Sequence, residues 1–163
     1  MPLTGYLKIP DIAGESQRAD HEEEIDLYNI EWLIKQASTA QIGAGRTRGR
    51  AEIGPVIVHK YYDASSPYLA LACMQGKSFD ESVVMVRKDS GEAHLDYLTI
   101  TLTNMTISHY QMLGASDEIE DGQMIRESLG LTCENIAVKY VVQDDAHAAG
   151  DEHEVEYDIA AGV

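Results

Sequence analysis

Apolar and polar residues alternate along most of this 163-residue chain, which is the pattern of β-strands with one buried face. The longest example, Leu95–Met112, reads LDYLTITLTNMTISHYQM. A change of phase near Asn29 indicates a β-bulge, and Val83–Val86 is apolar on both faces, which favours a strand covered on both sides. The predicted strands are Leu7–Ile9, Ile25–Leu27, Ile30–Lys35, Val56–Tyr61, Val83–Val86, Leu95–Leu102, Met105–Met112, Gln123–Leu131, Ile136–Val142 and Val155–Ile159.

One segment departs from this alternation and predicts a three-turn helix. Ser66 is a suitable N-cap, and Pro67 fits the first helical position, where its missing N–H costs nothing. An apolar stripe follows at the spacing i, i+3, i+4 and i+7, formed by Leu69, Ala72, Cys73 and Gly76. The final glycine can end the helix in a left-handed conformation. The sequence thus predicts a mainly β fold, a two-sheet β-barrel or sandwich with one lateral α-helix, in a single domain spanning residues 1–163.

A long glycine-rich segment, Thr39–Pro55, separates two predicted strands. Loops of this length are usually either functional or disordered. Its three arginines alternate, so in an extended chain their guanidinium groups lie on one side, where they suit an acidic neighbouring copy of the same chain. The glycine spacing does not match a dinucleotide fingerprint, so nucleotide binding is not expected. The candidate contact residues of this extended loop are Gly43, Gly45, Arg46, Arg48 and Arg50.

The charge balance is strongly acidic. The chain has 28 Asp and Glu against 12 Lys and Arg, a formal net charge of -16, which repels nucleic acid and anionic membranes. No apolar stretch approaches the ~20 residues of a membrane span, and the N-terminus lacks the features of a Sec signal peptide. We therefore expect folding in the cytoplasm, with no nucleic-acid partner and no membrane insertion. Cys73 and Cys133 lack metal spacing and are interpreted as reduced, buried small hydrophobes.

The chain offers few candidates for chemistry. His21 is followed by three glutamates, but no G-x-S-x-G nucleophile elbow exists, so a structural role where a strand begins is the favoured interpretation. Acidic residues and His crowd positions 144–158 without a recognisable metal-binding spacing, which favours a solvated acidic turn. We expect no catalytic residue, no metal and no cofactor. Trp32 is interpreted as a core anchor, which points Glu31 and Lys35 to the opposite face.

The joint order of several residues resembles a known family. They are Gly14-Glu15-Ser16, His21, Glu24-Ile25-Asp26, Trp32, the glycine-rich loop, Lys60, Asp63, Ser66-Pro67, Leu69, Ala72-Cys73, Gly76-Lys77, Arg87-Lys88, Tyr97–Leu102, Glu127 and Ile136–Tyr140. Together they resemble the hemolysin-coregulated protein family, Hcp, of the bacterial type VI secretion system. The resemblance covers nearly the whole chain.

The resemblance implies a non-catalytic structural subunit. Members of this family form hexameric rings that stack into the inner tube of a contractile injector, are capped by a VgrG-type spike, are propelled by a contractile sheath and are released into medium or target cells. Effectors can travel within the ring. For this chain the resemblance implies self-assembly, and the polar Glu31 and Lys35 become candidates for the lumen wall. No fused effector domain is expected.

Two departures from the family pattern affect stacking and cargo preference rather than the fold. Ile34 stands where members often have glycine, and the segment before Tyr157 is unusually acidic. Two other classes of protein fit the alternation alone, a lipocalin-type small-ligand barrel and an acid-dependent hydrolase built around His21. The first predicts an apolar cavity and the second a deep pocket.

Overall fold

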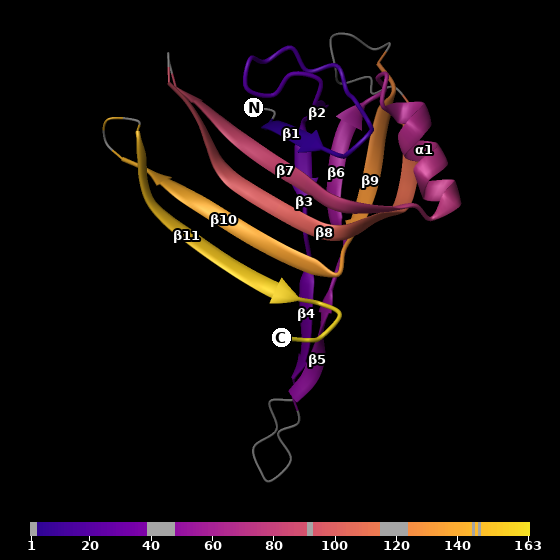
Figure 1. Ribbon diagram of the computed structural model, residues 1–163, viewed down its shortest axis with the longest axis vertical. Coiled ribbons are helices and arrows are strands. Elements are labelled where there is room, and N and C mark those ends of the chain that lie inside the picture. The colour runs from indigo at the N-terminus through magenta and orange to yellow at the C-terminus, as the bar shows by residue number, and fades with distance from the viewer. Residues whose placement is uncertain (1–2, 39–47, 91–92, 115–123, 145, 147) are drawn as a thin grey trace.

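The computed structural model of the protein describes residues 3–38, 48–90, 93–114, 124–144, 146 and 148–163 (Figure 1). Its strands and single helix are, in chain order, β1 (Thr4–Lys8), β2 (Ile25–Leu27), β3 (Asn29–Glu31), β4 (Ile34–Ser38), β5 (Arg48–Ile53), β6 (Val56–Tyr61), α1 (Ser66–Gln75), β7 (Ser78–Ser90), β8 (Ala93–Gly114), β9 (Arg126–Thr132), β10 (Asn135–Gln143) and β11 (Ala149–Asp158).

Within the described ranges, nine strands form one antiparallel sheet, and β4 pairs with β5 in a separate two-stranded sheet. The main path runs β2-β1-β7-β8-β9-β6-β3, and β10 with β11 extends from β8. Only Tyr28 separates β2 from β3, and its N–H donates to the His59 carbonyl at 2.9 Å. The sheet therefore returns on itself as a barrel. The predicted fold class is confirmed, and the predicted bulge near Asn29 corresponds to the break at Tyr28.

The prediction of two separate strands was wrong for β8. The sequence favours two strands, Leu95–Leu102 and Met105–Met112, but the structure has one strand of 22 residues. Asn104, with a φ of 51°, marks the joint between them. Residues 98–103 pair with β10, whereas residues 106–114 pair with β9, so one strand serves both parts of the sheet.

The predicted loop Thr39–Pro55 is also partly wrong, because Arg48–Ile53 forms β5 and pairs with β4, with Ile34 opposite Ile53. Figure 1 shows this β4–β5 hairpin projecting away from the barrel. The predicted strand Ile30–Lys35 is broken between β3 and β4. At the hairpin base the Gly54 N–H donates to the Leu33 carbonyl at 3.0 Å, and a Cβ on Gly54 would lie 2.6 Å from that oxygen.

The helix α1 forms where the sequence predicts it. Leu69 and Ala72 are buried against the barrel, and Gly76 ends the helix in the left-handed conformation, with φ 62° and its N–H bonded to Cys73 O at 3.2 Å. The predicted N-cap is wrong by one residue, because Ser65 occupies that position without a side-chain cap and Ser66 lies inside the helix. The Ser66 hydroxyl is fully buried and has other partners, described below.

The barrel interior is filled by side chains. Leu7, Ile25, Val58, Leu102 and Leu129 are all fully buried in one continuous core. A lipocalin-type cavity would need this space to be hollow. The two cysteines are free but only half-buried, so their predicted burial is correct only in part. None of the described helical residues belongs to a helix long and apolar enough to cross a membrane.

Candidate self-association surface

An apolar row crosses the sheet and continues beyond the barrel. Val84, Ile100, Val138 and Val155 are register partners on β7, β8, β10 and β11, and direct partners in an antiparallel sheet share a face. Val84 is fully buried and Ile100 is 4% exposed, but Val155 at the outer end is 70% exposed. The face that forms the core within the barrel is therefore uncovered where β10 and β11 leave it (Figure 1).

A groove lies between this uncovered face and the base of the β4–β5 hairpin. It has a volume of about 430 Å³. Its walls are mostly apolar and come from segments far apart in the sequence. They consist of Trp32, Ile34, Gln36, Ala51, Ile53, Ile136, Val138, Val155, Glu156 and Tyr157, which we call the β10–β11 groove. Exposed apolar grooves of this kind mark interaction sites in soluble proteins.

The opposite face of β11 is acidic. Glu154 is the register partner of Lys139, and the Lys139 Nζ lies 3.4 Å from Glu152 Oε1. The predicted solvated turn over residues 144–158 is wrong for this part, because residues 149–158 are strand. In the described sheet β11 pairs only with β10, so it is an edge strand, and a row of acids protects such an edge from unspecific pairing.

A second cavity, of about 590 Å³, lies on the other side of the hairpin base. Glu31 and Lys35, the candidate lumen residues, both line it together with Trp32 and Leu33. Glu31 Oε2 is 3.0 Å from His59 Nε2. Trp32 is half-buried at the edge of the core, and its Nε1–H donates to the Gly54 carbonyl at 3.0 Å. The indole thus fixes the base of the hairpin rather than the centre of the barrel.

A buried polar network fastens α1 to the barrel. The Lys60 ammonium lies 2.6 Å from Glu127 Oε1, 2.8 Å from Ser66 Oγ and 3.0 Å from Asp63 Oδ1. Lys60 and Glu127 have no exposed surface. The Ser66 hydroxyl also donates to Glu127 Oε1 at 2.6 Å. Burial is tolerated because each charge meets an opposite charge and further hydrogen bonds.

Tyr110 completes this network from β8. Its hydroxyl donates to the second oxygen of Glu127. Burial, followed by the hydrogen bond and the negative charge of Glu127, raises the pKa of the Tyr110 phenol far above its ordinary value. The phenol therefore stays protonated and remains a donor. The arrangement is a structural anchor, since every polar group in it is engaged with another.

His21 belongs to a second network, which holds the segment before β2 against the sheet. Its ring is 3% exposed, stacks on Tyr6 at 4.1 Å between centroids, and places Nδ1 2.7 Å from Glu24 Oε2 and Nε2 2.9 Å from Asp96 Oδ2. Arg87 Nε in turn donates to Asp96 Oδ1 at 3.0 Å. Both nitrogens of His21 are thus occupied by carboxylates, which supports the structural interpretation over that of a catalytic base.

Only two of the five predicted contact residues of the extended loop lie within the described part of the chain. Arg48 and Arg50 lie in β5, whereas Gly43, Gly45 and Arg46 fall outside the described residues. The uncovered apolar face was missed by sequence reasoning. The available signal was Val155 and Tyr157, which alternate with acids in the predicted strand Val155–Ile159. In the part of the chain that the structure covers, no three His, Cys, Asp or Glu side chains form a group suited to a metal.

The barrel, its lateral helix, the projecting hairpin and the uncovered sheet face define a class of β-barrel protein with one apolar sheet face open to solvent. The profile of the family described as "Type VI secretion system effector, Hcp" matches residues 6–140, and the chain belongs to this family. The protein hcp1 of Pseudomonas aeruginosa is 31% identical over 157 residues, which cover 96% of this chain and 94% of that protein.

Solved structures share the same fold. A type six secretion system protein superposes with a TM-score of 0.88 at 23% identity, covering 99% of this chain and 98% of the other. Hcp1 from Salmonella typhimurium superposes with a TM-score of 0.77 at 26% identity, covering 99% of this chain and 97% of the other. Hcp proteins are secreted by the type VI system and form the hexameric rings of its inner tube. They are structural proteins rather than enzymes.

Proposed function

We propose that this chain builds its ring through the uncovered face of β10 and β11, and that the rings stack into a hollow tube. The observation that carries the proposal is the row from Val84 to Val155, which continues the core into solvent. Covering this row with a neighbouring copy removes apolar surface from water, which is the main driving force for such association. A closed ring also needs a patch that meets a different patch on the next copy.

The substitution Val155→Asp tests this proposal. Val155 is 70% exposed in the isolated chain, so the change has little effect on folding. Within a ring the same carboxylate is buried without a partner, which opposes association. We expect a folded monomer by circular dichroism and light scattering. Thr103→Asp adds the same charge at an exposed position away from the groove, and this control should retain the hexamer. A hexamer formed by Val155→Asp would refute the proposal.

The β4–β5 hairpin is the proposed arm of the assembly, reaching across the ring interface or to the next ring. The proposed contact residues are Gly43, Gly45, Arg46, Arg48 and Arg50. The projection of the hairpin from the barrel and its basic sequence support this role, because the rest of the surface is mostly acidic. Deletion of residues 44–49 should give a folded monomer. A hexamer mass for that deletion would exclude the arm from ring formation.

The proposed partners outside the ring are a VgrG-type spike, a contractile sheath and effector proteins. The chain is expected in the bacterial cytoplasm before assembly and outside the cell, or in a target cell, after firing. Cargo in the lumen would meet a polar wall to which Glu31 and Lys35 contribute. Reversal of one charge, Glu31→Lys, should change effector retention and leave the ring mass unchanged. Unchanged retention of every effector tested would count against a lumen position.

A further inference from the structure

The connection between β1 and β2, residues 9–24, folds back on itself at one end of the barrel (Figure 1). The N–H of Gly14 donates to the Glu23 carbonyl at 2.7 Å, and the N–H of Glu23 donates to the Ser16 carbonyl at 3.0 Å. A Cβ on Gly14 would lie 2.4 Å from the Glu24 carbonyl oxygen, so the two limbs of the connection are in close contact. These bonds shape the connection, but they do not attach it to the barrel.

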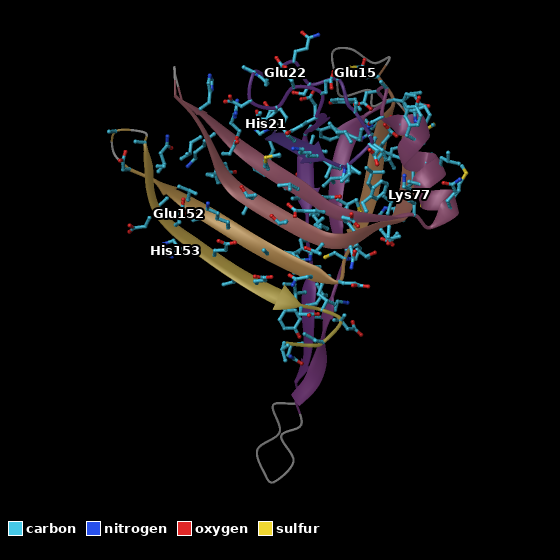
Figure 2. All side chains as sticks on the ribbon, in the orientation of Figure 1. Glu15, His21, Glu22, Lys77, Glu152 and His153 are labelled. Atoms are coloured by element: carbon cyan, nitrogen blue, oxygen red, sulfur yellow. The ribbon has the colours of Figure 1, made fainter. Side chains whose placement is uncertain are left out.

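The side chain of His21 joins the connection to the sheet. Its ring is buried and lies parallel to the ring of Tyr6 on β1, with an angle of 10° between the two planes. Its Nε2 lies 2.9 Å from Asp96 Oδ2 on β8, and its Nδ1 lies 2.7 Å from Glu24 Oε2 within the connection. In Figure 2, His21 lies between the connection and the sheet, whereas the exposed Glu22 lies on the outer side.

The two carboxylates determine which form of the ring fits this position. An ionised carboxylate only accepts hydrogen bonds, and a neutral imidazole has one N–H donor and one lone pair. A neutral ring would therefore place its lone pair 2.7 or 2.9 Å from a carboxylate oxygen, where two acceptors repel each other. Both hydrogen bonds form only when the cluster holds one additional proton. Because imidazole is a stronger base than a carboxylate, the fitting form is an imidazolium that donates from both nitrogens.

The surroundings of the ring also suit a positive charge. The face of a tyrosine ring attracts cations, and the His21 ring covers Tyr6 at 4.1 Å between centroids. Arg87 Nε donates to Asp96 Oδ1 at 3.0 Å, and an Arg87 terminal nitrogen lies 3.4 Å from Asp20, so this neighbouring cation already has carboxylate partners. The ionisable groups around the ring are Asp20 and Glu24 of the connection, Tyr6 of β1, Arg87 of β7 and Asp96 of β8. Three carboxylates against one guanidinium favour a second cation among them.

We propose that a proton on His21 holds the β1–β2 connection on the barrel. The doubly protonated ring satisfies Glu24 and Asp96 together. Loss of one proton leaves a lone pair facing a carboxylate, so one of the two bonds breaks and the connection loosens. The attachment is therefore held at low pH and weakens as the pH rises. The connection lines a hollow of about 600 Å³ beside Lys8, so this proton controls the shape of one end of the barrel, whether or not the chain is assembled.

Nitrogen-15 NMR of the histidine rings counts the protons on His21. In the unaltered chain at pH 5.5, the ring should show two N–H groups that exchange slowly with water, because both are buried and hydrogen-bonded. The variant His21→Gln identifies which signals belong to this ring. A single N–H on His21 at pH 5.5 would place the additional proton on a carboxylate and would overturn the proposal.

Amide hydrogen exchange of the unaltered chain measures the attachment itself. After correction for the intrinsic rates, the amides of Gly14, Ser16 and Glu23 should exchange about tenfold to a hundredfold faster at pH 9 than at pH 5.5, as expected for the loss of a hydrogen bond to a charged group. The amides of Ile100 and Leu102, in the centre of β8, should keep their protection, which excludes general unfolding. Equal protection of the connection at both pH values would overturn the proposal.

The variant Asp96→Asn separates the proton from the contact. The introduced amide can donate to Nε2 of a neutral ring, and its oxygen can still accept from Arg87 Nε. The connection should therefore stay attached at pH 9, and the pH dependence of its exchange should disappear. Asp80→Asn makes the same change at an exposed position of β7 and should keep the pH dependence of the unaltered chain. If exchange in Asp96→Asn followed the pH as it does in the unaltered chain, the proton on His21 would not hold the connection.

Discussion

Lys60 and Glu127 illustrate, at the scale of single residues, how the fold fixes the helix α1. Both are fully buried, and their charged atoms lie 2.6 Å apart. Ser66 belongs to the helix, whereas Lys60 and Glu127 belong to β6 and β9, so the network joins three elements. The position of the helix therefore depends on a small number of polar contacts.

Removal of one member of this pair should be costly. Lys60→Met leaves the Glu127 carboxylate buried without its cation, and the expected loss is about 3–5 kcal/mol of unfolding free energy. The double variant Lys60→Met, Glu127→Leu removes both charges and should lose less. Urea unfolding at matched protein concentration measures the difference. A double variant less stable than Lys60→Met would contradict this account.

Cys133 gives a second prediction at the residue scale. Burial raises the pKa of its thiol to about 11. Because the thiolate is the reactive form, only about one thiol in a thousand is ionised at pH 8. The labelling rate of Cys133 in a Cys73→Ala chain should therefore rise about tenfold per pH unit between pH 8 and 10. Equally fast labelling at pH 8 and pH 10 would contradict the raised pKa, and the urea-unfolded chain serves as the reference.

At the scale of elements, the alternating pattern predicted most strands because a half-buried strand repeats every two residues. The pattern failed to predict two strands, β8 and β5. The strand β8 reads as two strands because Asn104 interrupts the pattern, although the hydrogen-bonded ladder continues through the joint. The sequence of β5 was interpreted as part of a loop because it contains glycine and arginine rather than β-branched residues.

The candidate site was harder to predict than the fold. Along β11 the apolar residues Val155 and Tyr157 alternate in sequence with acids, which lie on the opposite face. The burial of the apolar face depends on strands far away in the sequence. Periodicity identifies a strand with two unlike faces, but it does not identify which face a neighbouring chain covers. The helix was predicted well because its stripe, proline and glycine are all local signals.

The end of α1 gives a prediction at this scale. Gly76 has a φ of 62°, and no atom lies within 4 Å of the position of a Cβ, so only the backbone conformation opposes a side chain there. Gly76→Ala should cost about 1 kcal/mol of unfolding free energy, and Gly76→Asn less. Gln75→Ala, at an exposed helical position, is the control and should be nearly neutral. Thermal unfolding compares the three, and equal midpoints for Gly76→Ala and the unaltered chain would contradict the account.

At the scale of the whole molecule, the net charge determines how strongly stacked rings repel one another. Each copy carries a formal net charge of -16, so a ring of six is strongly acidic and repels the next ring. Salt screens this repulsion, with a screening length of about 8 Å at physiological ionic strength. The yield of stacked tubes, counted by negative-stain microscopy, should therefore increase from low to physiological salt. A yield that falls steadily over this range would contradict the electrostatic argument.

The central claim is that the uncovered face of β10 and β11 closes the ring. The most direct test compares the light-scattering mass of the unaltered chain with that of Val155→Asp at physiological salt. We predict six copies of 18.0 kDa for the unaltered chain and a single copy for the variant. The same hexameric mass for both proteins would contradict the claim.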